Sequence, residues 1–88
     1  MDNYIIELKK SAGKELQRLP AADRLRVSAK IGLLTKRPWL ADIKKLSGHE
    51  EKYRMRVGNF RVLFLVEEKS KKIIIYAVGD RKDVYREI

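Results

Sequence analysis

Arginine and tyrosine, the residue types in this chain most suited to phosphate chemistry, are concentrated in residues 52–62 and 79–85. The first segment carries four basic side chains and no acidic one. Its Arg54 and Arg56 alternate with aromatic and apolar residues in the manner of a β-strand. Guanidinium groups along one face of a strand contribute little to folding, but their planar donors match phosphate oxygens. The pattern therefore predicts a strand that binds phosphate with one face.

The composition also points to a polyanionic partner. A length of 88 residues suits one domain over residues 1–88, and the net charge of +9 favours nucleic acid first and anionic lipid second. Because the chain has no cysteine and one histidine, we expect neither a metal site nor another cofactor. No apolar run approaches the roughly 20 residues of a membrane span, and the N-terminus lacks signal-peptide features. We therefore expect a cytoplasmic protein without a membrane partner.

The first half of the chain predicts one strand and two helices. Residues 4–8 alternate as a strand does, Ser11 is a suitable N-cap for a helix over residues 12–19, and Pro20 separates it from a second helix over residues 21–36. The face of the second helix expected to cover a sheet is formed by Leu25, Ala29 and Leu33, with Ile31 and Leu34 beside them.

The second half predicts a loop over residues 39–51 and then three strands. Gly58-Asn59 is a two-residue hairpin signal, and Gly79-Asp80 is expected to end the last strand before a C-terminal tail. The order β-α-α-β-β-β predicts an α+β fold, in which a helical hairpin packs on one face of a small, mainly antiparallel sheet. The other face is then left for function. The predicted strands span residues 53–57, 60–67 and 72–78.

Four motifs follow one another along the chain: SAxKELxxLP at residues 11–20, KKLxG at 44–48, YRxRVGxFRV at 53–62 and VGxRxxVY at 78–85. Together they resemble the RelE/ParE superfamily, the toxins of type II toxin–antitoxin pairs, over nearly the whole chain. RelE-like members cleave mRNA in the ribosomal A site, whereas ParE-like members inhibit DNA gyrase. The resemblance also implies a cognate antitoxin with an acidic or amphipathic segment, and a ribosome with its RNA as the second partner.

The residues that the resemblance assigns to catalysis are all present, which favours the RelE-like branch. They are Arg54, Arg56, Arg61, Arg81 and Tyr85. Four lysines in or near the same motifs are expected to contact RNA, namely Lys44, Lys45, Lys52 and Lys82. Some relatives have lysines at the first two arginine positions, or a histidine beside the terminal tyrosine, and this chain has neither. The spacing of the last arginine and tyrosine also varies in the family.

The activity implied is a metal-independent endoribonuclease, in which the ribose 2′-hydroxyl attacks the adjacent phosphorus. The products are a 2′,3′-cyclic phosphate and a free 5′-hydroxyl. Arg54 and Arg61 would stabilise the charge that develops on the phosphoryl oxygens. By the same resemblance, Arg81 would act at the leaving 5′-oxygen, and Tyr85 would stack under a base or transfer a proton.

The general base is not assigned by the sequence. An arginine almost never deprotonates, so Arg56 would stabilise an emerging alkoxide but is a poor proton acceptor. The candidates are Tyr85 as tyrosinate, a carboxylate of Glu50 or Glu51, water, or ribosomal RNA. A positive pocket lowers the pKa of a tyrosine and so favours the first candidate.

Other interpretations of the same residues remain open. The chain could be a gyrase-binding toxin without catalysis, or an RNA-binding module that does not cleave. Arg54 and Arg56 could be an ordinary solvent-exposed face, and Tyr85 could only pack the tail. Arg61 could pair with Glu67 or Asp80. Tyr53 and Phe60 are expected in the core.

Overall fold

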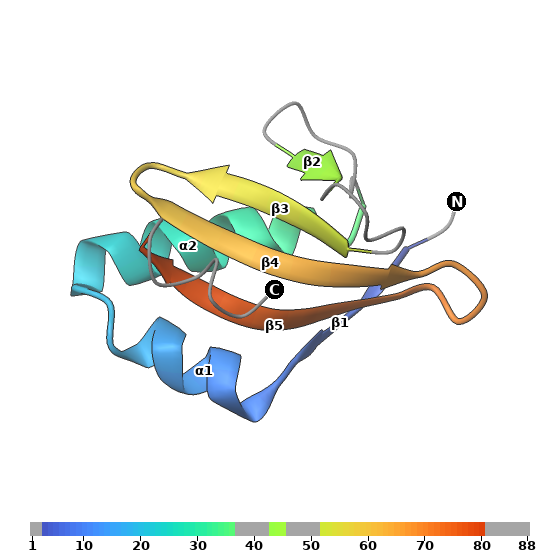
Figure 1. The fold of residues 1–88 in the computed structure, drawn as a ribbon, viewed down its shortest axis with the longest axis horizontal. Helices are drawn as coiled ribbons and strands as arrows, with labels where there is room; N and C mark the ends of the chain where they lie inside the picture. Colours follow the sequence, from blue (N-terminus) through green and yellow to red (C-terminus); the bar gives the residue numbers. More distant parts are fainter. Residues whose placement is uncertain (1–2, 37–42, 46–51, 81–88) are drawn as a thin grey trace.

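The computed structural model describes residues 3–36, 43–45 and 52–80. These residues form two helices and a five-stranded sheet of order β1-β5-β4-β3-β2, in which β1 and β5 are parallel and the other neighbours antiparallel. Both helices lie on the same side of the sheet (Figure 1), which confirms the predicted α+β architecture. In chain order the elements are β1 (Ile5–Leu8), α1 (Lys10–Gln17), α2 (Ala21–Leu33), β2 (Ile43–Lys45), β3 (Lys52–Val57), β4 (Phe60–Glu67) and β5 (Lys72–Asp80).

Two predictions about the strands are wrong. The predicted loop over residues 39–51 contains β2, whose three residues pair with β3 from Met55 back to Tyr53. A strand of three residues is too short to show a recognisable alternation, and it forms because its backbone pairs with β3. Gly79 and Asp80 do not end β5, since they continue the ladder opposite β4 and so keep their backbone groups paired.

The helices also differ from the prediction in two respects. Helix α1 begins at Lys10, after an N-cap at Lys9 that makes no side-chain hydrogen bond, so Ser11 lies inside the helix and is not its cap. The face of α2 chosen for the core is wrong in part: Leu25 is 70% exposed and Leu33 54% exposed. Ile31 and Leu34, which the prediction placed beside them, are buried, and so is Val27, which the prediction left out.

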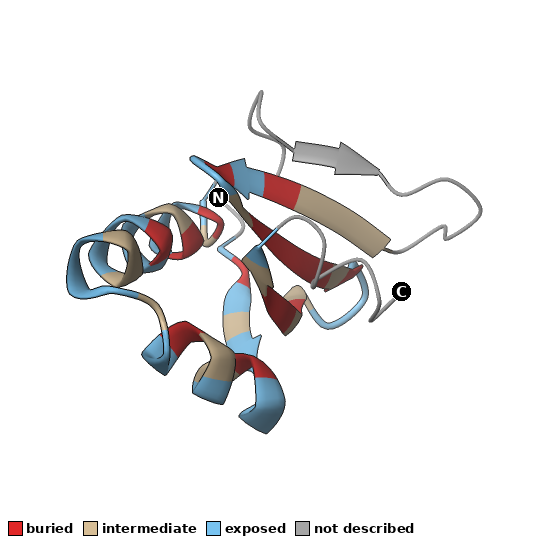
Figure 2. Cartoon of the chain, turned by 60° about the vertical axis from the view of Figure 1, so that its left-hand side comes forward, coloured by how far each residue is buried: buried red, intermediate tan, exposed pale blue. Residues whose placement is uncertain are grey.

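One hydrophobic cluster joins the helices to the sheet. Phe64 lies at its centre in β4, fully buried, and its ring stacks on that of Tyr53 in β3 with the centroids 5.8 Å apart. Tyr53 and Phe60 pack against the cluster, as expected. Figure 2 shows the buried residues of the strands and helices facing one another. The buried members are Tyr4, Ala12, Leu16, Val27, Ile31, Leu34, Met55, Val57, Val62, Phe64, Val66, Ile73, Ile75 and Val78.

The turn between β3 and β4 fixes the register of the two central strands. Val57 pairs with Phe60, so Gly58 and Asn59 form the two-residue loop that the sequence predicts. Gly58 has φ of 59°, in the left-handed region that glycine enters at least cost. A positive φ at the first loop residue alone fits a type II′ turn, whose twist matches that of the strands.

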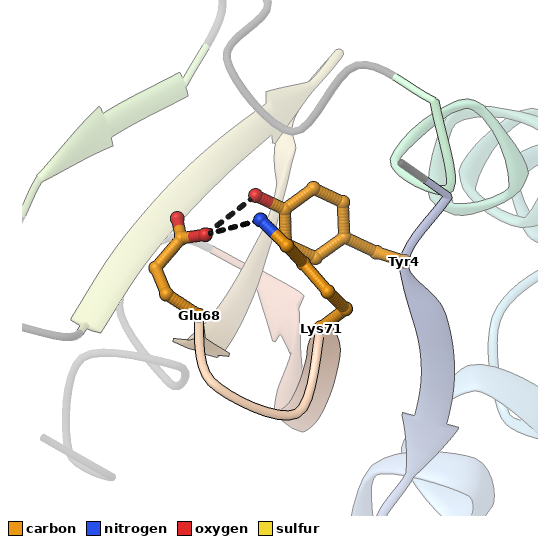
Figure 3. Close-up of polar contacts among 3 residues, drawn as sticks. All are labelled: Tyr4, Glu68 and Lys71. Atoms are coloured by element: carbon orange, nitrogen blue, oxygen red, sulfur yellow. Dashed lines mark hydrogen bonds and ion pairs between the residues drawn. The ribbon is translucent and has the colours of Figure 1, made fainter. Parts of the chain in front are cut away.

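A polar cluster closes the other end of the sheet, where β4 turns into β5 (Figure 3). The Tyr4 hydroxyl donates a hydrogen bond of 2.8 Å to Oε1 of Glu68, and Nζ of Lys71 lies 3.1 Å from the same oxygen. The Lys71 ammonium also lies 5.1 Å from the centroid of the Tyr4 ring. Because the amide of Tyr4 donates to the carbonyl of Thr35, the cluster ties the start of β1 to the end of α2 and to the β4–β5 turn.

The stability that this cluster adds should depend on pH. The hydrogen bond from Tyr4, and then Lys71, lower the pKa of Glu68 below its ordinary value, while the bond to Glu68 raises the pKa of Tyr4. The stability that the cluster adds is therefore fully present above the pKa that Glu68 has in the unfolded chain. It is lost as the pH falls through the lower pKa that Glu68 has in the folded protein. It is lost again as the pH rises through the raised pKa of Tyr4.

We expect Tyr4→Phe to lower the melting temperature by a few degrees near pH 7 and by progressively less as the pH falls and Glu68 takes up a proton. Thermal unfolding of wild type and variant from pH 2 to 8 measures this difference. An equal loss at every pH in that range would show that the hydroxyl stabilises the fold independently of the carboxylate.

Candidate functional site

The face of the sheet opposite the helices carries four of the predicted site residues, three of which are arginines. Along β3, Met55 and Val57 are buried in the cluster beneath the helices, so Arg54 and Arg56 lie on the other face. Arg61 in β4 is directly opposite Arg56 in the strand pairing and shares its face. We call Arg54, Arg56 and Arg61 the arginine face. The tight Gly58-Asn59 turn holds it together, because it sets the β3–β4 register.

Arg61 is the most unusual member of the arginine face. Its side chain is charged at any ordinary pH, yet the residue is only 6% exposed. Nη1 donates a 3.2 Å hydrogen bond to the carbonyl oxygen of Phe60, and Nε is buried without a partner in the described part of the chain. It makes no ion pair with Glu67 or Asp80. A buried cation costs stability unless a negative charge compensates it, and no described residue does so, which makes Arg61 suited to an anionic ligand.

The remaining two arginines are more accessible. Arg54 is half-buried opposite Leu63, and Arg56 is exposed beside the turn. Among the described residues, none of the ion pairs involves either of them. Lys52, on the same face two residues before Arg54, places a further cation along β3. From Lys52 to Arg56 the strand extends about 13 Å, so the cations can contact more than one phosphate of an extended chain.

Tyr76 also belongs to this face, and it was not among the site residues predicted from the sequence. Leu63 pairs with Ala77 and Phe64 with Ile75, so Tyr76 is the extra residue of a β-bulge in β5. It packs against Leu63 and Ala77, and the ammonium of Lys52 lies 5.6 Å from its ring centroid. Bulges turn a side chain away from its regular direction and are frequent beside functional sites. A lone tyrosine inside an isoleucine-rich strand was the only available signal.

The hydroxyl of Tyr76 is buried and has no hydrogen-bond partner among the described residues. Burial raises the pKa of this tyrosine above its ordinary value, so the hydroxyl stays protonated at neutral pH and can act as a donor. The arginine face and Tyr76 together therefore offer guanidinium and hydroxyl donors, with two buried donors unused. An anionic ligand with several acceptor oxygens fits this arrangement.

Because the Tyr76 hydroxyl has no partner in the part of the chain that the structure describes, Tyr76→Phe should leave the free energy of unfolding unchanged or raise it by up to about 1 kcal/mol. Urea unfolding followed by circular dichroism measures this change. A loss of more than about 1 kcal/mol would mean that the hydroxyl already has a partner in the folded protein. Leu63→Ala, which removes a fully buried neighbour, serves as the destabilising reference.

The structure describes only some of the other predicted site residues. Lys44 and Lys45 belong to β2, where they pair with Arg54 and Tyr53, so β2 adds two lysine positions beside the strand of the arginine face. The remaining predicted residues lie outside the described part of the chain, and so do the two candidate carboxylates for the general base. These are Arg81, Lys82 and Tyr85, with Glu50 and Glu51.

Neither a metal centre nor a membrane helix is found in the part of the chain that the structure describes. No group of three or more histidine, cysteine, aspartate or glutamate side chains gathers there in a way that could hold a metal ion. The described helices are too short and too polar to cross a bilayer.

Comparison with known proteins agrees with the fold and with the motifs. No family model matches the chain. A curated protein of Methanocaldococcus jannaschii that carries the name RelE1 is 33% identical over 86 residues, which cover 94% of this chain and 96% of the relative. The RelE–RelB complex of Pyrococcus horikoshii contains a chain that is 32% identical, with a TM-score of 0.80. The match covers 90% of this chain and 96% of the other. The RelB–RelE complex of Methanococcus jannaschii contains a chain that is 30% identical, with a TM-score of 0.75. This match covers 93% of this chain and 98% of the other. An identity of one third over nearly the full length of both chains places this protein in the RelE family of toxins.

Proposed function

We propose that this protein is the toxin of a toxin–antitoxin pair and that it cleaves mRNA in the A site of the ribosome. The observation that carries the proposal is the buried guanidinium of Arg61, which has no counterion among the described residues and lies beside Arg54 and Arg56 on the face of the sheet opposite the helices. A surface of this kind needs an anionic ligand, and the named relatives are RelE proteins, which supports RNA cleavage over gyrase inhibition.

In the proposed reaction the ribose 2′-oxygen attacks the adjacent phosphorus. The bond from phosphorus to the 5′-oxygen of the next nucleotide breaks, and the 2′-hydroxyl proton passes to a base. The leaving oxygen takes up a proton and becomes a free 5′-hydroxyl, while the other product carries a 2′,3′-cyclic phosphate. Arg61 and Arg54 bind the non-bridging phosphoryl oxygens, where the charge of the transition state increases. Arg56 stabilises the attacking oxygen as it loses its proton.

Two further roles belong to residues outside the described part of the chain. Arg81 stabilises the leaving 5′-oxygen, and Tyr85 stacks on a displaced base or transfers a proton. The general base comes from Tyr85, from Glu50 or Glu51, from water or from ribosomal RNA. A face rich in arginine lacks a good proton acceptor, so help from ribosomal RNA would explain why the reaction needs the ribosome.

The proposed protein partner is an antitoxin of the RelB type. The similar chains of Pyrococcus horikoshii and Methanococcus jannaschii were each solved in a complex of RelE with RelB. A toxin with a net charge of +9 attracts an acidic partner at long range, and such steering speeds association. The antitoxin would keep the toxin inactive until it is removed.

Purified ribosomes programmed with an mRNA, and incubated with increasing amounts of the protein, test the proposed activity. Loss of full-length mRNA with increasing protein is expected. Uncut mRNA over the whole titration, together with inhibition of DNA supercoiling by purified gyrase, would replace RNA cleavage with gyrase inhibition. Binding of ribosomes without cleavage or gyrase inhibition would reduce the function to RNA binding.

A further inference from the structure

The last part of β5 has a neighbouring strand on one side only. Strand β1 pairs with β5 from Lys72 to Ile75, and among the described residues no strand continues along this edge beyond Ile75. On the other side, the ladder with β4 runs on to Asp80. Buried backbone amides are almost always hydrogen-bonded, and Val78 on this stretch is only 2% exposed. Its amide therefore needs an acceptor from outside the sheet.

Glu15 of α1 supplies that acceptor. The amide of Val78 donates a hydrogen bond of 2.9 Å to Oε1 of Glu15. Helix α1 lies beside β5 (Figure 1), with Ala12 and Leu16 buried against the core and Glu15 half-buried at the margin of the same helix face. A hydrogen bond from an amide to an ionised carboxylate is stronger than one to a neutral oxygen. Glu15 thus fastens α1 to the end of β5.

A second contact of α1 lies on the other side of the β-bulge. The amide of Lys9, the N-cap of α1, donates a hydrogen bond of 2.9 Å to the carbonyl of Ile75. In a regular strand the residues whose backbone groups face one edge are two apart, whereas Ile75 and Val78 are three apart. The difference is the extra residue of the bulge, Tyr76. Both contacts can therefore form together only when β5 keeps its bulge.

The bulge decides which residue of β5 lies opposite Arg61. In the observed register, Phe64 pairs with Ile75 before the bulge and Arg61 pairs with Gly79 after it. If the pairing continued from Phe64 without the bulge, Val78 would lie opposite Arg61, because each side chain after Ile75 would move to the other face. Glycine leaves the position beside the guanidinium without a side chain, whereas valine would fill it. The arginine face thus depends on the bulged register.

We propose that Glu15 is a positioning residue of the catalytic site. Its hydrogen bond to the amide of Val78 holds β5 in the bulged register and so keeps Gly79 opposite Arg61. The inference rests on the proposed function, because the reaction that it serves is the proposed cleavage of mRNA. A displacement of a catalytic group by roughly 1 Å can cost about 10²-fold in rate, so a carboxylate on the opposite side of the sheet can matter to the chemistry.

The test compares two variants of Glu15 with a control of reduced stability. Glu15→Ala removes the acceptor, whereas Glu15→Gln keeps an oxygen that can accept the same hydrogen bond. Tyr4→Phe is the control, because it removes a hydrogen bond at the other end of the sheet. Cleavage on programmed ribosomes, at a temperature where every variant is folded, gives the maximal rate and the half-saturating protein concentration. Nuclear magnetic resonance follows the Val78 amide and the Nε–H group of Arg61 without any reaction.

Glu15→Ala should lower the maximal rate by about 10–10²-fold and leave the half-saturating concentration unchanged. Its Val78 amide should exchange with solvent at least about tenfold faster, and its Arg61 Nε–H signal should shift. Glu15→Gln should stay within about threefold of the wild-type rate, because the hydrogen bond is kept. Tyr4→Phe should cleave at the wild-type rate with an unshifted Arg61 signal.

A full rate in Glu15→Ala with an unshifted Arg61 signal would overturn the positioning role. Equal slowing by Glu15→Gln would overturn the part played by the hydrogen bond, and equal slowing by Tyr4→Phe would show that the rate follows stability alone. If the wild-type protein cleaves no mRNA, the proposed function fails. The Arg61 signal then decides the positioning by itself: a shift in Glu15→Ala but not in Glu15→Gln supports it, and no shift overturns it.

Discussion

Replacing Arg61 with methionine is expected to slow mRNA cleavage by about 10²–10³-fold, the cost of removing one donor that stabilises a developing oxyanion. Arg61 is suited to that role because its guanidinium is buried and holds a single hydrogen bond, to the carbonyl of Phe60. Nε is left without a partner in the described structure, so it is ready for a phosphoryl oxygen. The rate constant of cleavage on programmed ribosomes, measured at saturating protein, tests this expectation.

The same substitution should not destabilise the protein. Methionine has a similar length, and Arg61 has no counterion among the residues that the structure describes. Replacing such a buried charge by an apolar side chain is often neutral or stabilising. We therefore expect the activity to fall while the free energy of unfolding stays equal or rises. Arg18→Met, at an exposed arginine after α1, is the control and should leave both quantities unchanged. A stable Arg61→Met protein with full activity would remove Arg61 from the mechanism.

Phe64→Ala should have the largest effect on stability, a loss of about 3–5 kcal/mol. Phe64 is fully buried in the central strand β4, and its ring stacks on Tyr53. Removing the ring leaves a cavity between the sheet and the helices, where the neighbours from several elements can close it only in part. Domains of this size have a total stability of about 5–15 kcal/mol, so a substantial fraction of the variant should be unfolded at 37 °C.

Urea denaturation followed by far-ultraviolet circular dichroism measures this loss in the free energy of unfolding. Leu25→Ala is the matched control, because Leu25 is 70% exposed and its truncation should change the stability by no more than about 0.5 kcal/mol. A similar small change for Phe64→Ala would mean that the core is not organised around this ring.

The parts of the fold that were predictable from the sequence are those with a local signal. The hairpin of β3 and β4 was predicted within one residue, because Gly58 supplies the turn and the flanking residues alternate. The placement of Arg54 and Arg56 on one face follows from the same alternation, and Arg61 joins them once the register is fixed. Their catalytic role is still a prediction, which the Arg61 variants test.

The incorrect predictions concern elements whose structure depends on residues that are distant in the sequence. Strand β2 exists through its pairing with β3, and β5 extends past Gly79 because Arg61 and Phe60 of β4 continue the ladder. In α2 the sequence offers two apolar sides with helical spacing, and only the sheet selects Val27 and Ile31 for the core. The bulge that places Tyr76 on the face opposite the helices likewise arises from the β4–β5 register.

Primer extension on an mRNA, with the protein added in the presence and in the absence of ribosomes, tests the cleavage and its dependence on the ribosome together. We expect discrete cuts at codons in the A site, which require ribosomes and disappear with Arg61→Met. Efficient cutting of free RNA would contradict the ribosome dependence. Cuts of equal intensity with Arg61→Met would contradict the role of the arginine face, and the absence of cuts under every condition would contradict the proposed activity itself.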